Sequence, residues 1–302
     1  MGEKDVALKN YFTPERFADM FNAIVFNGRR TVDPRNVTPW DKETDEVKVK
    51  GKDVFANWRL RDTIKVVDLQ DAIYCLMAIE HQIKEAPEMP LRVMEYDVRE
   101  YLRQMREEGA SKLKPIITLV IYWKGDEWSY ATTLHEMFDE TAKEFLEKTG
   151  IISYLPDYSM NLFIPKAATE EELEKFETDL KYVMTYVRYS DDKNKLMNYA
   201  RENDIVLNIE SVTIINALTN SNLKIEEGKD EVQMCKALDD LIEDGRNEGR
   251  SEGIEIGRQE GSIIGFITAC REFDKKDTEI MELITEKYAI TNQEAERLMK
   301  EA

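Results

Sequence analysis

Three polar side chains, Asp62, Glu80 and Gln82, have the types and the spacing of a small catalytic centre. Glu80 and Gln82 lie two residues apart in the strand-like run 73–82, so both project from one face, and His81 points to the other. A second strand-like run, 58–67, precedes it across a polar turn at residues 68–71. A hairpin centred near residue 71 would set Asp62 opposite Glu80 to within one residue.

Two carboxylates on one face, ~5 Å apart at their Cβ atoms, repel each other unless a cation lies between them. Carboxylate oxygens favour hard ions such as Mg²⁺ or Mn²⁺, which polarise a phosphate and activate a bound water. Gln82 would hold that water through hydrogen bonds, and Lys84 is a weaker candidate for the same face. The alternative is that Asp62 and Glu80 are salt-bridged surface residues, because a D…ExQ pattern often occurs by chance.

The chain contains few histidines and cysteines that could take part in catalysis or metal binding. The two histidines are His81 and His135, and the three cysteines form no CxxC pair. A disulfide framework or a structural zinc site is therefore not expected. We expect His81 to be a buried structural residue, and His135 carries no functional signal.

The net charge of −19 argues against a nucleic-acid partner until its distribution is considered. Residues 1–124 contain 21 acidic and 21 basic side chains, whereas 125–219 contain 19 and 9, and 220–302 contain 21 and 12. The excess negative charge thus lies outside the segment with the candidate site. Basic residues in that segment are candidates for phosphate contact or, equally, ordinary solvated side chains: Arg29, Arg30, Arg35, Lys48, Lys50, Lys52, Arg92, Arg99, Arg103 and Arg106.

The elements that would position the site follow an α/β order. A helix over 13–26, with Thr13 as N-cap and Pro14 at its first position, precedes the hairpin. An amphipathic helix over 90–108 and a β-branched strand over 115–123 follow it. Further helices are predicted over 134–148, 170–189 and 193–203, with a strand over 161–165, and 205–230 is unassigned. We expect an α/β core over 1–165, a helical extension over 166–230 and a helical C-terminal region over 231–302.

Glycines recur every fourth residue from Gly245 to Gly265. On a helix they would form a slowly drifting stripe, at a cost of roughly 1 kcal/mol each relative to alanine. Such a helix needs a packing partner, in this chain or in a second copy, unless the tract is a partly frayed low-complexity segment. Two short helices, over 276–288 and 291–300, end the chain.

Several stretches resemble the recombination-promoting nuclease family, also known as the PD-(D/E)XK nuclease family of YhgA-like transposases. They are MAIEHQIKEAPEMPLRVMEYD (77–97), LRDTIK (60–65), RFADMFNAIVF (16–26), PIITLVIYW (115–123) and LHEMFD (134–139). The resemblance implies a restriction-endonuclease-like α/β fold, a mixed sheet flanked by helices. It also implies Mg²⁺-dependent DNA endonuclease activity linked to recombination or mobile elements.

Position by position, the resemblance assigns Asp62, Glu80 and Gln82 as catalytic residues, with Asp62 and Glu80 binding the metal ion. Asp19 is a further metal-ligand candidate, although a helix-surface role is the alternative. Arg92 and Tyr96 would touch phosphate or brace Gln82, and core packing is the alternative for Tyr96.

The competing functional hypothesis is a catalytically weak interaction or regulatory protein that acts through its acidic helical C-terminal half. With either function, the chain could form a homo-oligomer through the Gly245–Gly265 helix. A third possible function is transposase activity with strand transfer. The N-terminus lacks an apolar signal segment, and no apolar run approaches the ~20 residues of a membrane helix. We therefore expect a cytoplasmic protein.

Overall fold

The computed structural model describes residues 7–8, 10–39, 63–68, 74–106, 109–226 and 228–302. Asp62 lies outside these ranges, as do Lys48, Lys50 and Lys52. Contacts divide the chain into two compact units, Met1–Ala237 and Leu238–Ala302.

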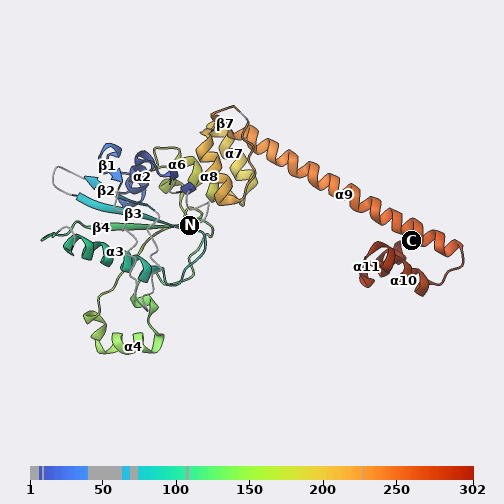
Figure 1. Ribbon diagram of the computed structural model, residues 1–302, viewed down its shortest axis with the longest axis horizontal. Helices are drawn as coiled ribbons and strands as arrows, with labels where there is room; N and C mark the ends of the chain where they lie inside the picture. The colour runs from blue at the N-terminus through green and yellow to red at the C-terminus, as the bar shows by residue number, and fades with distance from the viewer. Residues whose placement is uncertain (1–6, 9, 40–62, 69–73, 107–108, 227) are drawn as a thin grey trace, which may run out of the picture. The chain divides into compact units, whose positions relative to one another are not determined.

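The first unit contains a five-stranded mixed sheet in the order β1-β2-β3-β4-β5 (Figure 1). Its strands are β1 (Val37–Pro39), β2 (Thr63–Asp68), β3 (Tyr74–Gln82), β4 (Ile116–Tyr122) and β5 (Asn161–Phe163). β1, β2 and β3 are antiparallel neighbours, whereas β4 and β5 continue the sheet parallel to β3. The β2–β3 pairs run from Thr63 with Ile79 to Asp68 with Tyr74. This register confirms the hairpin predicted about residue 71.

Helix α3 (Met89–Arg106) connects β3 to the parallel strand β4 and covers one face of the sheet. Met89 and Val93 of α3 pack there against Val120 of β4 and against Met160. In the sequence, the apolar side of this helix is the stripe Leu91, Met94, Val98, Tyr101, Leu102 and Met105, and the expectation that this stripe packs on the core is wrong for most of it. Leu91, Val98, Leu102 and Met105 remain exposed, because the sheet accepts the neighbouring positions Val93, Tyr96 and Asp97.

The opposite face of the sheet is covered by the N-terminal segment. Phe12 stacks on His81 of β3 with ring centroids 5.1 Å apart, and its carbonyl accepts a hydrogen bond from Lys65 of β2. Helix α2 (Pro14–Met20) follows, and the Thr13 hydroxyl caps it by accepting from the Arg16 amide. A π-helical turn, η1 (Phe21–Val25), extends it toward Gly28, whose φ of +81° ends the helical segment.

Residues 166–233 add a largely helical region. It contains α5 (Glu170–Leu173), α6 (Leu180–Tyr189), α7 (Lys193–Asn203) and α8 (Ile209–Thr219), with the paired strands β6 (Val206–Asn208) and β7 (Glu231–Gln233). The single helix predicted over 170–189 is wrong at 174–179, where the chain leaves the helix to bond α2. The helix predicted over 134–148 also differs, because a 3₁₀ turn, η3 (His135–Met137), precedes α4 (Glu140–Thr149). The Asp139 side chain caps α4, and a second 3₁₀ turn, η4 (Ile151–Tyr154), follows it.

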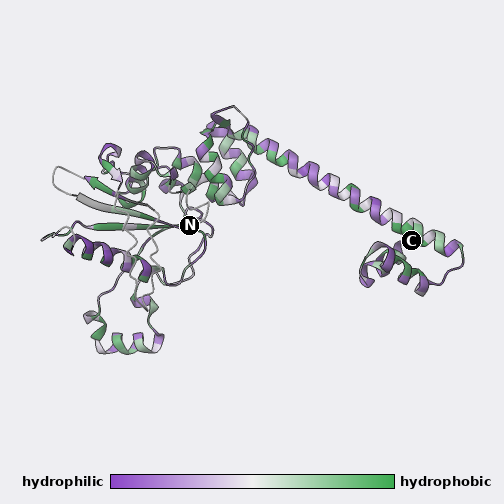
Figure 2. Ribbon diagram, viewed as in Figure 1, coloured by the Kyte–Doolittle hydropathy of each residue, from purple (hydrophilic) through white to green (hydrophobic). Residues whose placement is uncertain are grey.

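The second unit consists of the long helix α9 (Met234–Glu272), most of which lies in it, α10 (Asp277–Tyr288) and α11 (Asn292–Glu301). Ile263, Ile267 and Cys270 near the end of α9 form a core with Ile280, Ile284, Ala295 and Leu298. A methyl group added at any of the glycines from 245 to 265 would meet no packing neighbour within 4 Å among the described residues. Figure 2 shows this middle part of α9 as mainly hydrophilic.

The mixed sheet flanked by helices, followed by a helical C-terminal region, confirms the predicted α/β class and agrees with a restriction-endonuclease-like core. Among the described helices, none combines the length and the apolar character required to cross a bilayer.

Candidate active site

Glu80 lies near the end of the central strand β3, and its side chain is almost completely buried, at 1% exposure. In the parallel register it stands beside Val120 of β4. Alternation along the strand gives Glu80 and Gln82 one face and His81 the other. The structure therefore brings Glu80 and Gln82 to the same face of the sheet, the one that α3 covers.

Arg92 on the first turns of α3 faces Glu80 across this layer. Its Nη2 atom lies 3.9 Å from Glu80 Oε2, and the Arg92 side chain is 18% exposed. An isolated buried carboxylate is strongly unfavourable, and arginine keeps its charge at all relevant pH values. Arg92 thus provides positive charge that offsets the burial of the Glu80 carboxylate.

Gln82 is the last residue of β3 and is 9% exposed. Its main-chain carbonyl accepts a hydrogen bond of 2.9 Å from the Trp123 amide just beyond β4. This bond fixes the backbone from which the side-chain amide projects. The amide offers both a donor and an acceptor at the end of the strand, on the same face as Glu80.

His81 has the structural role that the sequence predicts. Its ring stacks on Trp123 at 5.9 Å between centroids, and its Nδ1 atom lies 3.3 Å from the Trp123 indole N–H, which donates to it. Burial lowers the pKa of His81 to about 3. The imidazole is therefore neutral at physiological pH and faces away from Glu80.

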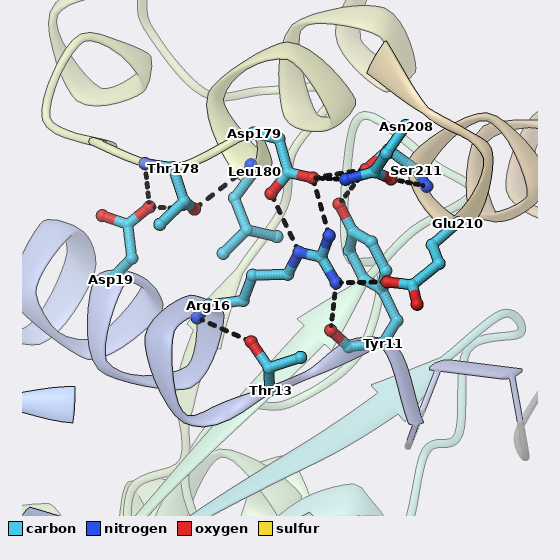
Figure 3. Close-up of polar contacts among 10 residues, drawn as sticks. All are labelled: Tyr11, Thr13, Arg16, Asp19, Thr178, Asp179, Leu180, Asn208, Glu210 and Ser211. Carbon is cyan, nitrogen blue, oxygen red and sulfur yellow. Dashed lines mark hydrogen bonds and ion pairs between the residues drawn. The ribbon is translucent and has the colours of Figure 1, made fainter. Parts of the chain in front are cut away.

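Asp19 is engaged by the segment between α5 and α6 (Figure 3). One carboxylate oxygen accepts from the Glu177 amide at 2.9 Å, and the other accepts from the amide and the hydroxyl of Thr178. Asp19 belongs to the helical layer opposite α3, so the structure does not bring it to the face that carries Glu80. These contacts give Asp19 a clear role in holding residues 177–178 against α2.

A second buried cluster that the sequence did not reveal joins α2 to α6 and α8 (Figure 3). Arg16 forms a bidentate pair with Asp179, with two N–O distances of 2.8 Å, and its Nη1 atom donates to Glu210 and to the Tyr11 carbonyl. Ser211 and Asn208 also donate to Asp179, and the Tyr11 hydroxyl bonds Ser211. Burial raises the pKa of Asp179, but the hydrogen bonds from Arg16 and Ser211 outweigh it and leave that pKa below its usual value.

The partners of Asp179 are separated from it by up to 163 residues, which explains why no local pattern indicated the cluster. An open groove of about 440 Å³ lies beside it, lined by residues that include Thr178, Lys181, Asn208 and Glu231.

The basic residues considered for phosphate contact have different surroundings. Arg30 pairs with Glu177, Arg35 pairs with Asp33, and Arg29 donates to the Phe26 carbonyl. Lys84 follows the end of β3 and is exposed. Lys65 bonds the Phe12 carbonyl on the other face of the sheet. Among the basic side chains of the described residues around β3, Arg92 is thus the one placed at Glu80.

No group of three or more His, Cys, Asp or Glu side chains suited to a metal ion occurs within the described ranges, which omit Asp62. Glu80 supplies one carboxylate of the hard, oxygen-rich type that Mg²⁺ prefers, and Gln82 an amide oxygen beside it. The described residues thus bring two oxygen-bearing side chains to one face, and a magnesium site there would require a further carboxylate.

Comparison with known proteins places the candidate residues inside a family match. Residues 57–212, more than half of the chain, match the family model described as "Putative transposase, YhgA-like". The matched segment includes Asp62, Glu80, Gln82 and Arg92. Neither the curated proteins nor the solved structures gave a match.

Proposed function

Since the chain belongs to the YhgA-like transposase family, we propose that it is a metal-dependent DNA endonuclease linked to recombination or mobile elements. The family description supports DNA as the substrate. The observation that carries the catalytic part is the placement of Glu80 and Gln82 on one face at the end of the central strand, with Arg92 beside Glu80.

Asp62 enters this proposal through the register of its neighbours. Thr63 pairs with Ile79 across the β2–β3 hairpin. The same register continued by one pair would set Asp62 opposite Glu80, with both carboxylates on one face. We propose that Asp62 and Glu80 together hold a divalent cation, Mg²⁺ or Mn²⁺. When bound there, such an ion would polarise the scissile phosphate and lower the pKa of a nearby water.

The protein's own groups then orient the reactants. The Gln82 amide would hold the attacking water by hydrogen bonds, and Arg92 would add positive charge close to Glu80. As the water oxygen bonds to phosphorus, the water releases a proton to solvent. One phosphorus–oxygen ester bond then breaks, and the departing oxygen takes up a proton from solvent. Because Gln82 carries no charge, the positive charge of the site would come from the cation and from Arg92.

Cleavage of supercoiled plasmid tests this proposal. We expect nicked and linear products with Mg²⁺, none with a chelator, and at least a 100-fold lower rate for Asp62→Asn and Glu80→Gln. Glu147→Gln is a matched control, because Glu147 is exposed on α4. Equal cleavage by all four proteins would remove Asp62 and Glu80 from the mechanism.

An integration assay with a marked DNA fragment separates hydrolysis from strand transfer. Hydrolysis alone gives nicked or linear plasmid, whereas joined products would show that the chain also transfers strands.

A further inference from the structure

One side of α3 carries a line of arginines that begins at the candidate active site. Arg92, Arg99 and Arg106 are spaced by seven residues along the helix. Seven residues are almost two full turns, so successive members drift by only about 20° around the axis. They are separated by about 10.5 Å along it. We refer to these three residues as the α3 arginine row.

Burial and pairing distinguish this row from the fourth arginine of the helix. Arg103 is buried and donates two hydrogen bonds to Glu100, which neutralises its charge within the fold. Arg99 and Arg106 are exposed, whereas Arg92 is partly exposed beside Glu80. Arg99 pairs with Glu95 one turn earlier, but both side chains are about half exposed. Exposed pairs of this kind contribute little to stability, so a phosphate can replace Glu95 at little cost.

The segment after α3 is held against the end of the helix and contains one exposed lysine. The Gln104 side chain accepts a hydrogen bond of 2.8 Å from the Lys114 amide and donates to its carbonyl. This contact ties residues 110–114 to the last turn of α3. Lys112, which is exposed, lies in that segment.

We infer that the α3 arginine row binds the phosphate backbone of the DNA substrate and leads it to Glu80. This inference rests on the proposed function for the identity of the ligand. The charge distribution supports this inference. The net charge of the chain is −19, whereas residues 1–124 contain 21 acidic and 21 basic side chains and are neutral overall. A polyanion is repelled by most of this protein, so its binding requires a local row of cations. Contacts to the backbone carry no base information, and the row would therefore bind DNA without sequence preference.

Salt dependence of DNA binding tests the row without requiring cleavage. The affinity of the full-length chain for a labelled 20-base-pair duplex is measured by fluorescence anisotropy over a KCl series, in EDTA. Each phosphate contact contributes about −0.9 to the slope of log affinity against log salt. Arg99→Gln and Arg106→Gln should each make the slope less negative by about 0.9, and the double variant by about 1.8. Arg258→Gln, an exposed arginine of α9, should leave the slope unchanged.

Unchanged slopes in Arg99→Gln and Arg106→Gln would overturn the inference, as would equal changes in Arg258→Gln. If the row instead binds an acidic protein surface, the slopes of Arg99→Gln and Arg106→Gln would be unchanged. Plasmid cleavage is scored separately. If the slopes of the arginine variants become less negative but no protein cleaves plasmid, the endonuclease proposal is wrong and the DNA-binding row is supported. If cleavage depends on Glu80 but the slopes are unchanged, the endonuclease proposal is supported and the row is wrong.

Discussion

Glu80 combines two properties that rarely occur together, a charged side chain and 1% exposure. Arg92, 3.9 Å away, supplies a cation on the same side of the sheet. Removal of one partner from a buried ion pair leaves the other charge desolvated, which typically costs about 3–5 kcal/mol. Because Arg92 is partly exposed, the cost of removing Glu80 should be lower than this. The Glu80 carboxylate would still stabilise the fold in addition to its proposed role in catalysis.

Two substitutions at Glu80 separate these contributions. Glu80→Ala opens a cavity beside Arg92 and should lower the free energy of unfolding by about 2–3 kcal/mol. Glu80→Gln keeps the volume and an acceptor oxygen and should lower it by less, while both variants lose cleavage. Urea unfolding followed by circular dichroism measures the difference. If the Glu80→Gln variant is stable but inactive, Glu80 has a chemical role. If this variant is fully active, the role of Glu80 is structural only.

The low pKa of His81 should make the stability of the first unit sensitive to pH. Its folded-state pKa of about 3 is far below the value near 6.5 expected in the unfolded chain. As pH falls below 6.5, the unfolded state takes up a proton that the native state refuses, so stability falls. The loss should reach about 2–3 kcal/mol at about pH 4.5.

Urea unfolding at about pH 7 and about pH 4.5 measures this effect. The wild type and His135→Phe should lose more stability on acidification than His81→Phe, which has no imidazole at this position. The same loss in all three proteins would show that other groups cause the acid sensitivity.

Single residues differ in how well the sequence predicts them. The shared face of Glu80 and Gln82 and the opposite direction of His81 follow from the two-residue period of a strand. The pairing of Glu80 with Arg92 does not follow from any local rule, since it depends on the path of α3 across the sheet. The engagement of Asp19 by residues 177–178 depends on contacts between residues 158 and 159 positions apart in sequence.

At the scale of elements, the break between α5 and α6 is the feature that most changes the interpretation of the sequence. Residues 170–189 have an uninterrupted helical pattern, yet Asp19 and Arg16 of α2 bond the backbone and side chains of residues 177–179. These bonds replace the helical hydrogen bonds that would otherwise form there. Tertiary contacts thus override the local helical preference, and they fix α2 to the helical region.

Asp19→Ala tests whether this carboxylate is structural. Loss of three hydrogen bonds should lower the free energy of unfolding by about 2 kcal/mol. The Mg²⁺ concentration that gives half-maximal cleavage should stay at the wild-type value. Thermal unfolding and a Mg²⁺ titration of plasmid cleavage give the two readouts. A large rise in the Mg²⁺ requirement with unchanged stability would instead assign Asp19 to the metal site.

At the scale of the whole molecule, the glycine series of α9 is the feature least explained by the chain itself. Six glycines cost the helix roughly 1 kcal/mol each relative to alanine, and no described residue packs against them. The alternatives from the sequence, a packing partner such as a second copy or a partly frayed low-complexity tract, are therefore still untested. Residues 220–302 also carry an acidic excess, with 21 acidic and 12 basic side chains, and would repel DNA.

A chain that ends at Asp244 tests both expectations. It lacks the glycine series and much of the acidic C-terminal region. We expect the full chain to have at least twice the monomer mass by light scattering, the shortened chain to have the monomer mass, and cleavage by the shortened chain to be faster. If neither mass nor rate changes, residues 245–302 are neither an oligomerisation element nor a regulator.

The central claim, a divalent cation held by Asp62 and Glu80, can be tested by local cleavage of the polypeptide. Fe²⁺ replaces Mg²⁺ in the purified protein, and ascorbate with peroxide generates hydroxyl radicals at the bound ion. Mass spectrometry then locates the broken peptide bonds. We predict breaks clustered around residue 62 and residues 80–82 that disappear in Glu80→Gln. Breaks elsewhere in the chain that persist unchanged in Glu80→Gln would contradict the proposed site.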